Sequence, residues 1–556
     1  MASLTLTADQ IRRIKERHGK LKDVRTAFDG QYRDLQKYFA PHRGRFVTSD
    51  RNRGGKKITG IVNGTSLIAA RTLAAGMMSG LTSPTRPWFA LNVADPLISE
   101  ARGTRIWLDS VNQLMLDVFQ RSALYDALAT VYLELGIFGV AAMSTVGSSE
   151  TGLSARALTV GEYSIASDDR GKVNTFFREF EASVGQLVQW FGKDNCSAKT
   201  QSAYDRGDYD SGIVVIHAVQ PNAFFDPTSL VGAFKRFSSV YLEIGGDEGK
   251  TLGVSGFDEF PVMVPRWEVT STDDYGGNSP AMVALGDTQA LQTLEKKKAQ
   301  AIEKVNNPPM VADTSLRNEP ATVLPGGITY VQNSTGKGFS PAYQINPPID
   351  YMSAEVERHQ DRINRAMFSD LFLMLQALDD RQRTAREISE RHEEKLLMLG
   401  PVLERLHEEL LKPLVDRAFS IMSRNGWLPP APPELQGQEL KVEFISVLAQ
   451  AQKAVSNGAN QQFLGFVQAV AQLNPQALDI VDFHELLIGV ADASGVKPSV
   501  IRDKKTVEET QRKAQETQAA IAAQQIQGQA GMQQAQTMKT MGDTNMANAQ
   551  QIAGAA

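Results

Sequence analysis

The stretch that decides the fold is SPAMVALGDTQALQTLEKKKAQAIEKV at Ser279–Val305, which ends at an Asn-Pro-Pro break at 307–309. Its apolar residues recur at helical spacing, so it is predicted to form a long amphipathic helix. A similar pattern covers about 350–378 and follows a matching Asn-Pro-Pro break at 346–348. Proline cannot continue a helix, so the same signal bounds both segments. We expect two antiparallel rods, each roughly 40 Å long at about 1.5 Å per residue.

The insert between the rods has two short strand patterns, at 321–324 and 328–331. They are joined by Pro325-Gly326-Gly327, which is typical of a hairpin turn. We therefore expect the rods to carry a small α/β domain at one end.

Toward the N-terminus, helical periodicity covers 8–40, 63–81 and 99–136. On the first of these, one stripe holds Ile11, Ile14, His18, Leu21 and Arg25. From about 137 to 270, short strand patterns alternate with Gly and Asp turns, and one short helix is expected at 183–192. This region should be mixed and mainly β, with strands at 213–219, 237–244 and 261–269.

Toward the C-terminus, a helical pattern at 385–425 contains Pro401 and Pro413, which predict a kink rather than three separate helices. A Pro-rich linker at 426–438, a strand at 440–445 and shorter helices follow. The last fifty residues are dominated by Gln, Ala and Met. Such a tail can be a lone helix, a helix in an oligomeric bundle, or disordered.

Composition limits the function. With 556 residues the chain is expected to form several domains, and its 42% apolar and 22% charged residues are ordinary for a globular protein. The net charge of −5 argues against a dedicated nucleic-acid binder, although Met1–Gly60 holds 15 Lys and Arg residues against 6 Asp and Glu residues. One cysteine, Cys196, excludes an internal disulfide and a Cys-based zinc site. No apolar run is long enough to span a membrane, so we expect a soluble protein.

Enzyme motifs are incomplete. The sequence GGDEGKT at Gly245–Thr251 is like a phosphate-binding loop, but Ile244 occupies the position of the first glycine. We expect a hairpin loop there. The His-Glu pairs at 392–393 and 407–408 lack the second histidine of a zinc-protease helix and are expected on a helix surface. We expect no catalytic residue, cofactor or metal.

Three blocks of sequence, in order, carry a family resemblance. The first is GLTSPTRPWF at Gly80–Phe89. The second holds Gly256-Phe257, Pro261, Arg266-Trp267, Tyr275-Gly276, SPAM at 279–282 and Pro308-Pro309. The third holds TAREI at 384–388, Arg391, LGP at 399–401, Arg405-Leu406 and Pro413-Leu414. Together they resemble the portal, or head-to-tail connector, proteins of short-tailed bacteriophages, over about residues 10–500.

The resemblance implies an α+β, predominantly helical subunit of a homo-oligomeric ring, usually of about twelve copies. On this resemblance, residues 1–278 would form the wing, 279–305 and 350–378 the two stem helices, and 306–349 the clip between them. The tunnel loop would be 379–384 and the kinked helix 385–425. Residues 426–446 would form the wing return strand and linker, 447–505 the crown, and 506–556 the tail.

The implied role is a conduit for double-stranded DNA during packaging and ejection, located at the portal vertex of the virion after assembly in the host cytoplasm. The implied partners are the packaging terminase, the major capsid and scaffolding proteins and the tail adaptors, with no membrane. Candidate channel residues are Arg381, Arg383, Lys296, Lys297 and Lys298; candidate clip contacts are Pro325, Gly326 and Gly327. The alternative for the lysine run is a solvated helix face, and the alternative for Arg381 and Arg383 is ordinary charge at the start of a helix. The alternatives are an internal scaffolding or core protein and an enzyme with an unfamiliar site.

Overall fold

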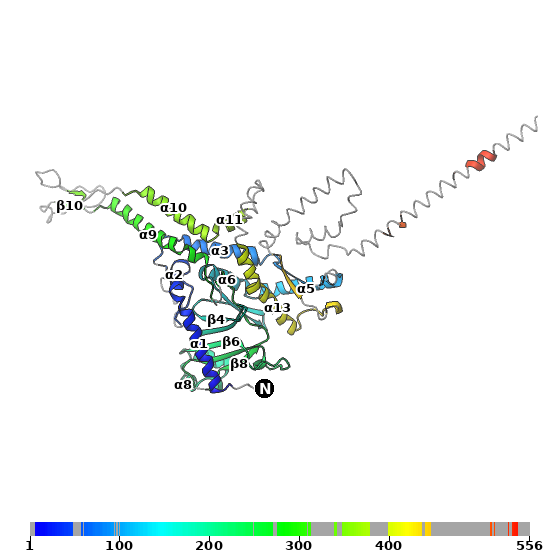
Figure 1. The fold of residues 1–556 in the computed structure, drawn as a ribbon, viewed down its shortest axis with the longest axis horizontal. Coiled ribbons are helices and arrows are strands. Elements are labelled where there is room, and N and C mark those ends of the chain that lie inside the picture. Colours follow the sequence, from blue (N-terminus) through cyan, green and yellow to red (C-terminus); the bar gives the residue numbers. More distant parts are fainter. Residues whose placement is uncertain are drawn as a thin grey trace, which may run out of the picture. The chain divides into compact units, whose positions relative to one another are not determined.

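The structure is a computed structural model. It describes residues 6–47, 57–58, 60–93, 95, 98, 101–247, 249–270, 275–308, 310–312, 339–341, 347–377, 399–435, 440–445, 512–513, 516–517, 532 and 536–542. Long helices and antiparallel sheets make the fold α+β, as predicted (Figure 1).

The chain divides into two compact units. The first consists of Met1–Ala90, Asn112–Leu428 and Val442–Gly458, and the second of Leu91–Val111, Pro429–Lys441 and Ala459–Ala556. Within the second unit, the Trp107 indole donates a hydrogen bond to the Pro429 carbonyl at 3.1 Å. Its described tail residues, such as 536–542, are helical. The first unit holds the candidate site.

Helices α1 (Ala8–Thr26) and α2 (Asp29–Phe39) open the first unit. Thr7 and Gln10 form a reciprocal capping box at the start of α1. The predicted stripe faces inward, with Leu21 half-buried and four members buried: Ile11, Ile14, His18 and Arg25. The single helix predicted over 8–40 is wrong. The Phe28 amide donates to the Arg25 carbonyl, three residues back instead of four, where α1 ends. The Phe28 ring lies against Tyr275, with 5.2 Å between the ring centroids.

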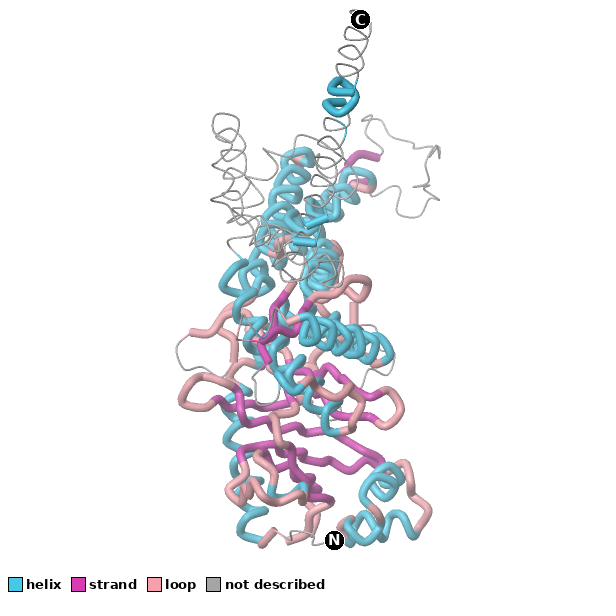
Figure 2. The backbone as a smooth tube through the Cα atoms, turned by 90° about the vertical axis from the view of Figure 1, so that its right-hand side faces the viewer, coloured by secondary structure: helices cyan, strands magenta, loops and turns pink. Residues whose placement is uncertain are grey.

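The main sheet is antiparallel, in the order β4-β5-β6-β7-β8. Its strands are β4 (Tyr163–Ser167), β5 (Val173–Ser183), β6 (Gly212–Pro221), β7 (Phe237–Glu243) and β8 (Gly253–Phe257). Helix α1 packs Ile11 and Ile14 against Phe177, Val240 and Leu242 of the sheet. In Figure 2 most of the magenta strands lie in the lower half of the picture, with cyan helices beside them. The segment 245–251 joins β7 to β8, so the hairpin loop predicted there is confirmed.

A second core lies under two short helices, α7 (Val184–Phe191), which was predicted, and α8 (Ala198–Asp205), which was not. Cys196 is fully buried in this core beside Leu187 and Val215, so it is a core residue. Helix α8 is too short to show a helical period, but Ser197 caps its first turn.

The region after α3 (Thr65–Leu81) and β1 (Phe89–Val93) contains two helices, α5 (Arg102–Arg121) and α6 (Leu124–Phe138). The single helix predicted over 99–136 is wrong. At the break, Ser122 donates its hydroxyl to the Phe119 carbonyl at 2.9 Å. The break separates the amphipathic α5 from α6, most of which is buried, and α6 ends at Gly139 with a positive φ of 76°.

A smaller sheet has the order β3-β2-β9, with β2 (Ala142–Ser148), β3 (Gly152–Leu158) and β9 (Val262–Met263). The strand predicted over 261–269 is therefore much shorter. Pro265 has no amide hydrogen to donate, which interrupts the ladder, and pairing resumes beyond it only as an isolated bridge between Val140 and Arg266.

The two predicted rods are α9 (Pro280–Asn306) and α10 (Ile349–Ala366), which lie side by side (Figure 1). At the insert, β10 (Met310–Ala312) pairs antiparallel with β11 (Phe339–Pro341). The second rod ends earlier than predicted: it breaks at 367–368 and continues as α11 (Ser369–Ala377). Phe368 adopts a positive φ of 54°, which no helical residue has, so one helix over 350–378 is wrong.

The predicted kinked helix is described from residue 399. A helical segment at 399–406 continues through a π-helical turn (His407–Leu411) into α13 (Lys412–Arg424). The π turn ends two residues before Pro413, whose missing amide hydrogen would leave an α-helical carbonyl without a donor. His407 is not a surface residue, because its ring stacks on Phe444 at 4.4 Å. A short turn (Pro433–Leu435) and the predicted strand β12 (Leu440–Phe444) follow, and β12 pairs with β1.

Candidate functional site

The hairpin formed by α9 and α10 is the candidate functional site. Its seam is apolar, with Leu291 of α9 and Val356 and Ile363 of α10 buried. A polar clamp crosses it, because the Asp287 carboxylate lies 2.8 Å from His359 Nδ1 and 3.1 Å from the Arg362 guanidinium. Each rod thus buries one stripe and leaves polar faces exposed, as the sequence pattern predicted.

The first rod is anchored at its base and along its middle. Ser279 caps α9 and donates its hydroxyl to the Ile137 carbonyl at 2.7 Å. Further along, the Gln292 carboxamide accepts from the amides of Val62 and Asn63 at 2.8 and 3.0 Å and donates to the Asn63 carbonyl at 2.7 Å. The three Gln292 bonds hold one face of α9 against the segment before α3, and the Ser279 bond holds its base against α6.

The lysine run lies in the outer half of α9. Lys296 and Lys297 are exposed, and Lys298 is half-buried. None of the three forms an ion pair with another residue that the structure describes. Consecutive helical residues point about 100° apart, so the three ammonium groups fan out rather than converge on one point. Three ammonium groups that point in different directions match a ligand with several separate negative charges better than they match a single carboxylate.

The second rod is anchored where it breaks. Phe372 of α11 fits against Gly76 of α3 so closely that a Cβ at position 76 would lie 2.1 Å from the Phe372 ring. The Ser369 hydroxyl donates to the Ala69 carbonyl at 3.5 Å, and Phe368 lies 6.2 Å from Trp267, centroid to centroid. The positive φ of Phe368 is therefore held by packing on both sides of the break.

The kinked helix is pinned to the β region by arginines. Arg266 donates to both Glu409 oxygens, at 2.6 and 3.3 Å, and its side chain is 3% exposed. Arg417 donates to the Thr145 carbonyl at 2.7 Å, and its burial lowers the pKa of its guanidinium to about 10. The π turn that carries Glu409 is thus a fixed part of the fold.

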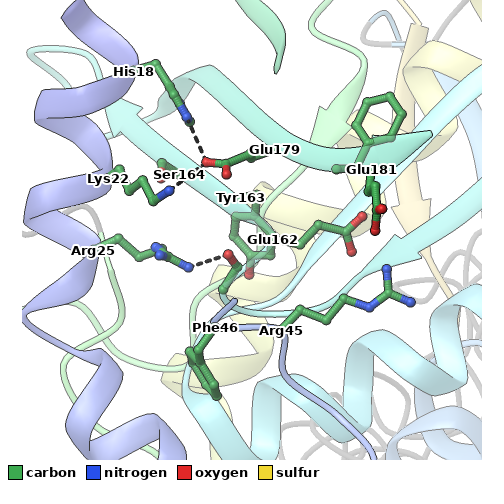
Figure 3. Close-up of a pocket in the computed structure, with 12 residues that line it drawn as sticks. His18, Lys22, Arg25, Arg45, Phe46, Glu162, Tyr163, Ser164, Glu179 and Glu181 are labelled. Atoms are coloured by element: carbon green, nitrogen blue, oxygen red, sulfur yellow. Dashed lines mark hydrogen bonds and ion pairs between the residues drawn. The ribbon is translucent and has the colours of Figure 1, made fainter. Parts of the chain in front are cut away.

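A charged pocket of about 40 Å³ lies between α1 and β4–β5 (Figure 3). The Glu179 carboxylate lies 3.1 Å from His18 Nε2 and accepts a hydrogen bond from the Lys22 ammonium at 2.8 Å. Arg25 donates to the Gly161 carbonyl. The cavity has room for about one or two water molecules. Its charges pair with one another, so it attaches α1 to the sheet and offers no ligand site. The sequence indicated this only through His18 and Arg25 on an otherwise apolar stripe.

A fully buried carboxyl group lies nearby. Burial raises the pKa of Glu134 on α6 to about 7, although the Thr159 hydroxyl, Arg43 and the Val160 amide favour its ionised form. Burial likewise raises the pKa of Tyr163. The Glu134 Oε1 atom has no hydrogen-bond partner. The sequence offered no signal for this group, since Glu134 lies in a helix that is otherwise largely apolar.

Several predicted site residues lie outside the described residues. These are Arg381, Arg383, Pro325, Gly326 and Gly327, together with the tunnel loop at 379–384 and the crown at 447–505. Among the residues that the structure describes, no cluster of His, Cys, Asp and Glu could hold a metal ion. Nor is any helix in that part of the chain long and apolar enough to cross a membrane.

The chain matches the family of bacteriophage head to tail connecting proteins over residues 12–501, and it belongs to that family. It is 42% identical to the portal protein of Salmonella phage epsilon15 over 97% of this chain and 98% of that relative. It is also 42% identical to the probable portal protein of Bordetella phage BPP-1, over 88% of each chain. The resemblance predicted from the three sequence blocks is confirmed.

Two solved structures share lower similarity. One is the neck of an empty gene transfer agent particle, at 11% identity and a TM-score of 0.34, covering 72% of this chain and 86% of that one. The other is the virion of a native gene transfer agent particle, at 11% identity and a TM-score of 0.33, covering 78% and 94%.

Proposed function

We propose that this chain is the portal subunit of a tailed-phage head, the structural ring through which double-stranded DNA enters and leaves the capsid and to which the tail attaches. Family membership over residues 12–501 carries the proposal. The α9–α10 hairpin supports it, because a rod pair with one buried stripe and exposed faces completes its burial against copies of itself. We propose a ring of about twelve copies.

The regions of the subunit follow from this proposal. Residues 1–278 and 426–446 form the wing, and the stem consists of 279–305 and 350–378, with its second helix broken at Phe368. The clip at 306–349 is closed at its base by β10 and β11, which bring the two ends of the insert together. The tunnel loop at 379–384 faces the bore, the kinked helix at 385–425 crosses the stem, and the crown occupies 447–505.

The channel works by weak and selective electrostatics. Each phosphate that a protein neutralises adds affinity for DNA, and tight binding would oppose sliding in both directions. A chain of net charge −5, repeated around a ring, repels DNA except at chosen cationic positions. We assign Arg381 and Arg383 to one such position and Lys296–Lys298 to another. The second assignment is supported by the exposure of Lys296 and Lys297, neither of which pairs with an acidic residue in the described ranges.

The proposed partners are the packaging terminase and later the tail adaptors at the clip, including Pro325, Gly326 and Gly327, and the major capsid and scaffolding proteins at the wing. Its proposed location is the portal vertex of the virion, after assembly in the host cytoplasm. The role is structural rather than enzymatic, and the motor that hydrolyses nucleotide is a separate protein. The one phosphate-loop-like segment supports this, since it joins two hairpin strands and opens no helix.

The alternative, an internal scaffolding or core protein, would be helical and form no hollow ring. The three-stranded and five-stranded antiparallel sheets of the first unit favour the portal. Negative-stain images of the purified chain, with its mass from light scattering, test the choice. We expect rings with an open centre and ten to fourteen copies. A stable single chain, or an assembly without a hole, would refute the proposal.

The lysine position is tested by Lys296→Glu combined with Lys297→Glu. Both side chains are exposed, so rings should form normally while packaging or retention of DNA changes. Lys20→Glu on α1 is the matched control. It reverses the charge of an exposed lysine that lies outside both stem helices. Normal packaging and retention by the double variant would remove Lys296 and Lys297 from the channel.

A further inference from the structure

The second rod carries a stripe of arginines. Arg358, Arg362 and Arg365 follow one another at steps of four and three residues, so they share one face of α10. All three are exposed, and the side chains of Arg358 and Arg362 are 63% and 53% accessible to solvent. At about 1.5 Å per residue the stripe is about 10 Å long. It is therefore long and open enough to meet an extended ligand.

The first rod carries two cations at a matching spacing. Lys297 and Lys304 are seven residues apart, about two helical turns, and both are exposed. Both lie about 80–100° round the α9 axis from Asp287, which contacts the second rod. In the other sense of rotation they lie about 120–140° from Gln292, which bonds to the segment before α3. The two lysines therefore point away from both of these contacts.

The arginines and the two lysines lie on the same side of the hairpin. The rest of the unit covers the other side of both rods, because Gln292 of α9 bonds to residues 62 and 63, and α10 contacts α3, which lies beside it in Figure 1. On α10 the arginine stripe lies about 100–160° round the axis from the buried Ile363. We call the side that carries Arg358, Arg362, Arg365, Lys297 and Lys304 the cationic face.

The cationic face keeps a surplus of positive charge. Glu355 pairs with Arg358, and Asp287 lies 3.1 Å from the Arg362 guanidinium. The other three cations of the face pair with no acidic residue in the ranges that the structure describes. Five cations against two carboxylates leave a surplus of three.

The remaining acidic residues of α10 gather on a different side. Asp350, Glu357 and Asp361 recur at steps of seven and four, so they form a stripe of their own. This acidic stripe lies on average about 90° round the α10 axis from the arginines. The charges of the second rod are thus sorted by face rather than mixed, which favours a different neighbour for each face.

We propose that the cationic face is turned toward the bore and contacts the phosphate backbone of double-stranded DNA. The inference rests on the proposed ring and deepens it, because it adds the arginines of the second rod to the channel wall and selects Lys297 from the lysine run. Each DNA strand carries one charge per about 3.4 Å of helix axis, so a stripe of about 10 Å spans about three phosphates of one strand. A polyanion of this kind compensates the surplus charge of the face, whereas an apolar or basic partner would leave it uncompensated.

The two paired arginines suit a duplex that must slide. Glu355 and Asp287 offset part of the charge of Arg358 and Arg362, so these guanidinium groups attract a phosphate less strongly than free ones would. Because each fully neutralised phosphate adds affinity, partial compensation keeps the attraction of the face weak. The face can therefore guide the duplex without holding it in place.

Photo-cross-linking in DNA-filled heads tests which face meets the duplex. A benzoylphenylalanine replaces Arg358 in the full chain, and the control places the same group at Glu357, which is also exposed and lies at the same height on α10 but about 100° round its axis. We expect cross-links to DNA from position 358 and few or none from position 357. If heads fill but both positions cross-link to DNA equally, or position 358 cross-links only to protein, the inference is overturned and the proposed portal ring stands. If the unaltered chain forms no rings, the proposed function fails and the inference fails with it.

A change of charge gives an independent measure. Arg365→Gln removes one positive charge per copy from the cationic face and should change the rate of DNA loss from filled heads by about fivefold or more. An exposed ionic contact is worth up to about a factor of five, and every copy carries the change. The matched control is Asn364→Asp, which lowers the charge equally at the next position, on the side of the acidic stripe, and should leave the rate unchanged. An unchanged rate for Arg365→Gln, or equal effects of the two variants, would contradict the inference.

Discussion

The ion pair between Arg266 and Glu409 gives a prediction whose size follows from its geometry. Arg266 donates to Glu409 through its backbone amide at 2.9 Å and through Nε and Nη2 at 3.3 and 2.6 Å. The Arg266 side chain is 3% exposed and that of Glu409 16%. Removing one partner of a buried pair costs about 3–5 kcal/mol, because the other charge stays buried without compensation.

We therefore expect Glu409→Met to lower the free energy of unfolding by about 3 kcal/mol, at the lower end of that range. The lower end applies because Arg266 keeps its 2.7 Å bond to the Gly171 carbonyl. Replacing both residues by methionine should cost much less than the two single changes together, since no buried charge then remains. The coupling between the two sites should be about 2 kcal/mol.

The assay is urea denaturation at one fixed subunit concentration, followed by circular dichroism and by tryptophan fluorescence, since Trp267 adjoins Arg266. Arg12→Met is the matched control: Arg12 pairs with Asp9 but its side chain is 69% exposed, so the change should stay within about 0.5 kcal/mol. A loss below about 1 kcal/mol for Glu409→Met, or additive effects of the two single changes, would refute the reasoning.

Three further predictions concern packing, pH and DNA. Gly76→Ala should destabilise the chain by about 1–3 kcal/mol, because its Cβ would overlap the Phe372 ring, and thermal denaturation measures this. The pKa of Glu134 is raised from 4.5 to about 7 in the folded chain, so the folded state holds this proton more tightly than the unfolded state. The stabilisation is full below about pH 4.5, and the free energy of unfolding falls by about 3 kcal/mol as the pH rises to about 7. Glu134→Gln should abolish that slope in urea titrations across this range. Replacing Arg381 and Arg383 with Glu should leave rings intact but alter DNA packaging or retention, which counts of DNA-filled heads measure.

Local patterns in the sequence predicted the elements well where the pattern was long or its ends were marked. The helix at 279–305 was recognised from its period and the Asn-Pro-Pro break, and the structure has it at Pro280–Asn306. The stripe of Ile11, Ile14 and His18 was placed on the correct face of α1. These features depend on residues three or four positions apart, which any reader of the sequence can compare.

The breaks inside long helices were missed, because nothing in the helical period marks them. Phe368 leaves the helical region where Trp267 and Gly76 provide packing partners for it and for Phe372. The break at Ser122 separates an amphipathic helix from one whose residues are mostly buried, and no Pro or Gly marks it. A helical period alone continues through such positions, because it contains no information about what the next turn will touch.

The sequence by itself determined the order of the elements, the paired rods with their proline-bounded insert, the absence of a complete nucleotide or zinc motif, and the family, because these are written in neighbouring residues and in short blocks. Only the tertiary structure decided which charges are buried together, such as Arg266 with Glu409, and that the second rod breaks at Phe368. The physical reason is that burial and charge pairing depend on distances between atoms, and residues more than a hundred positions apart meet only when the chain has folded.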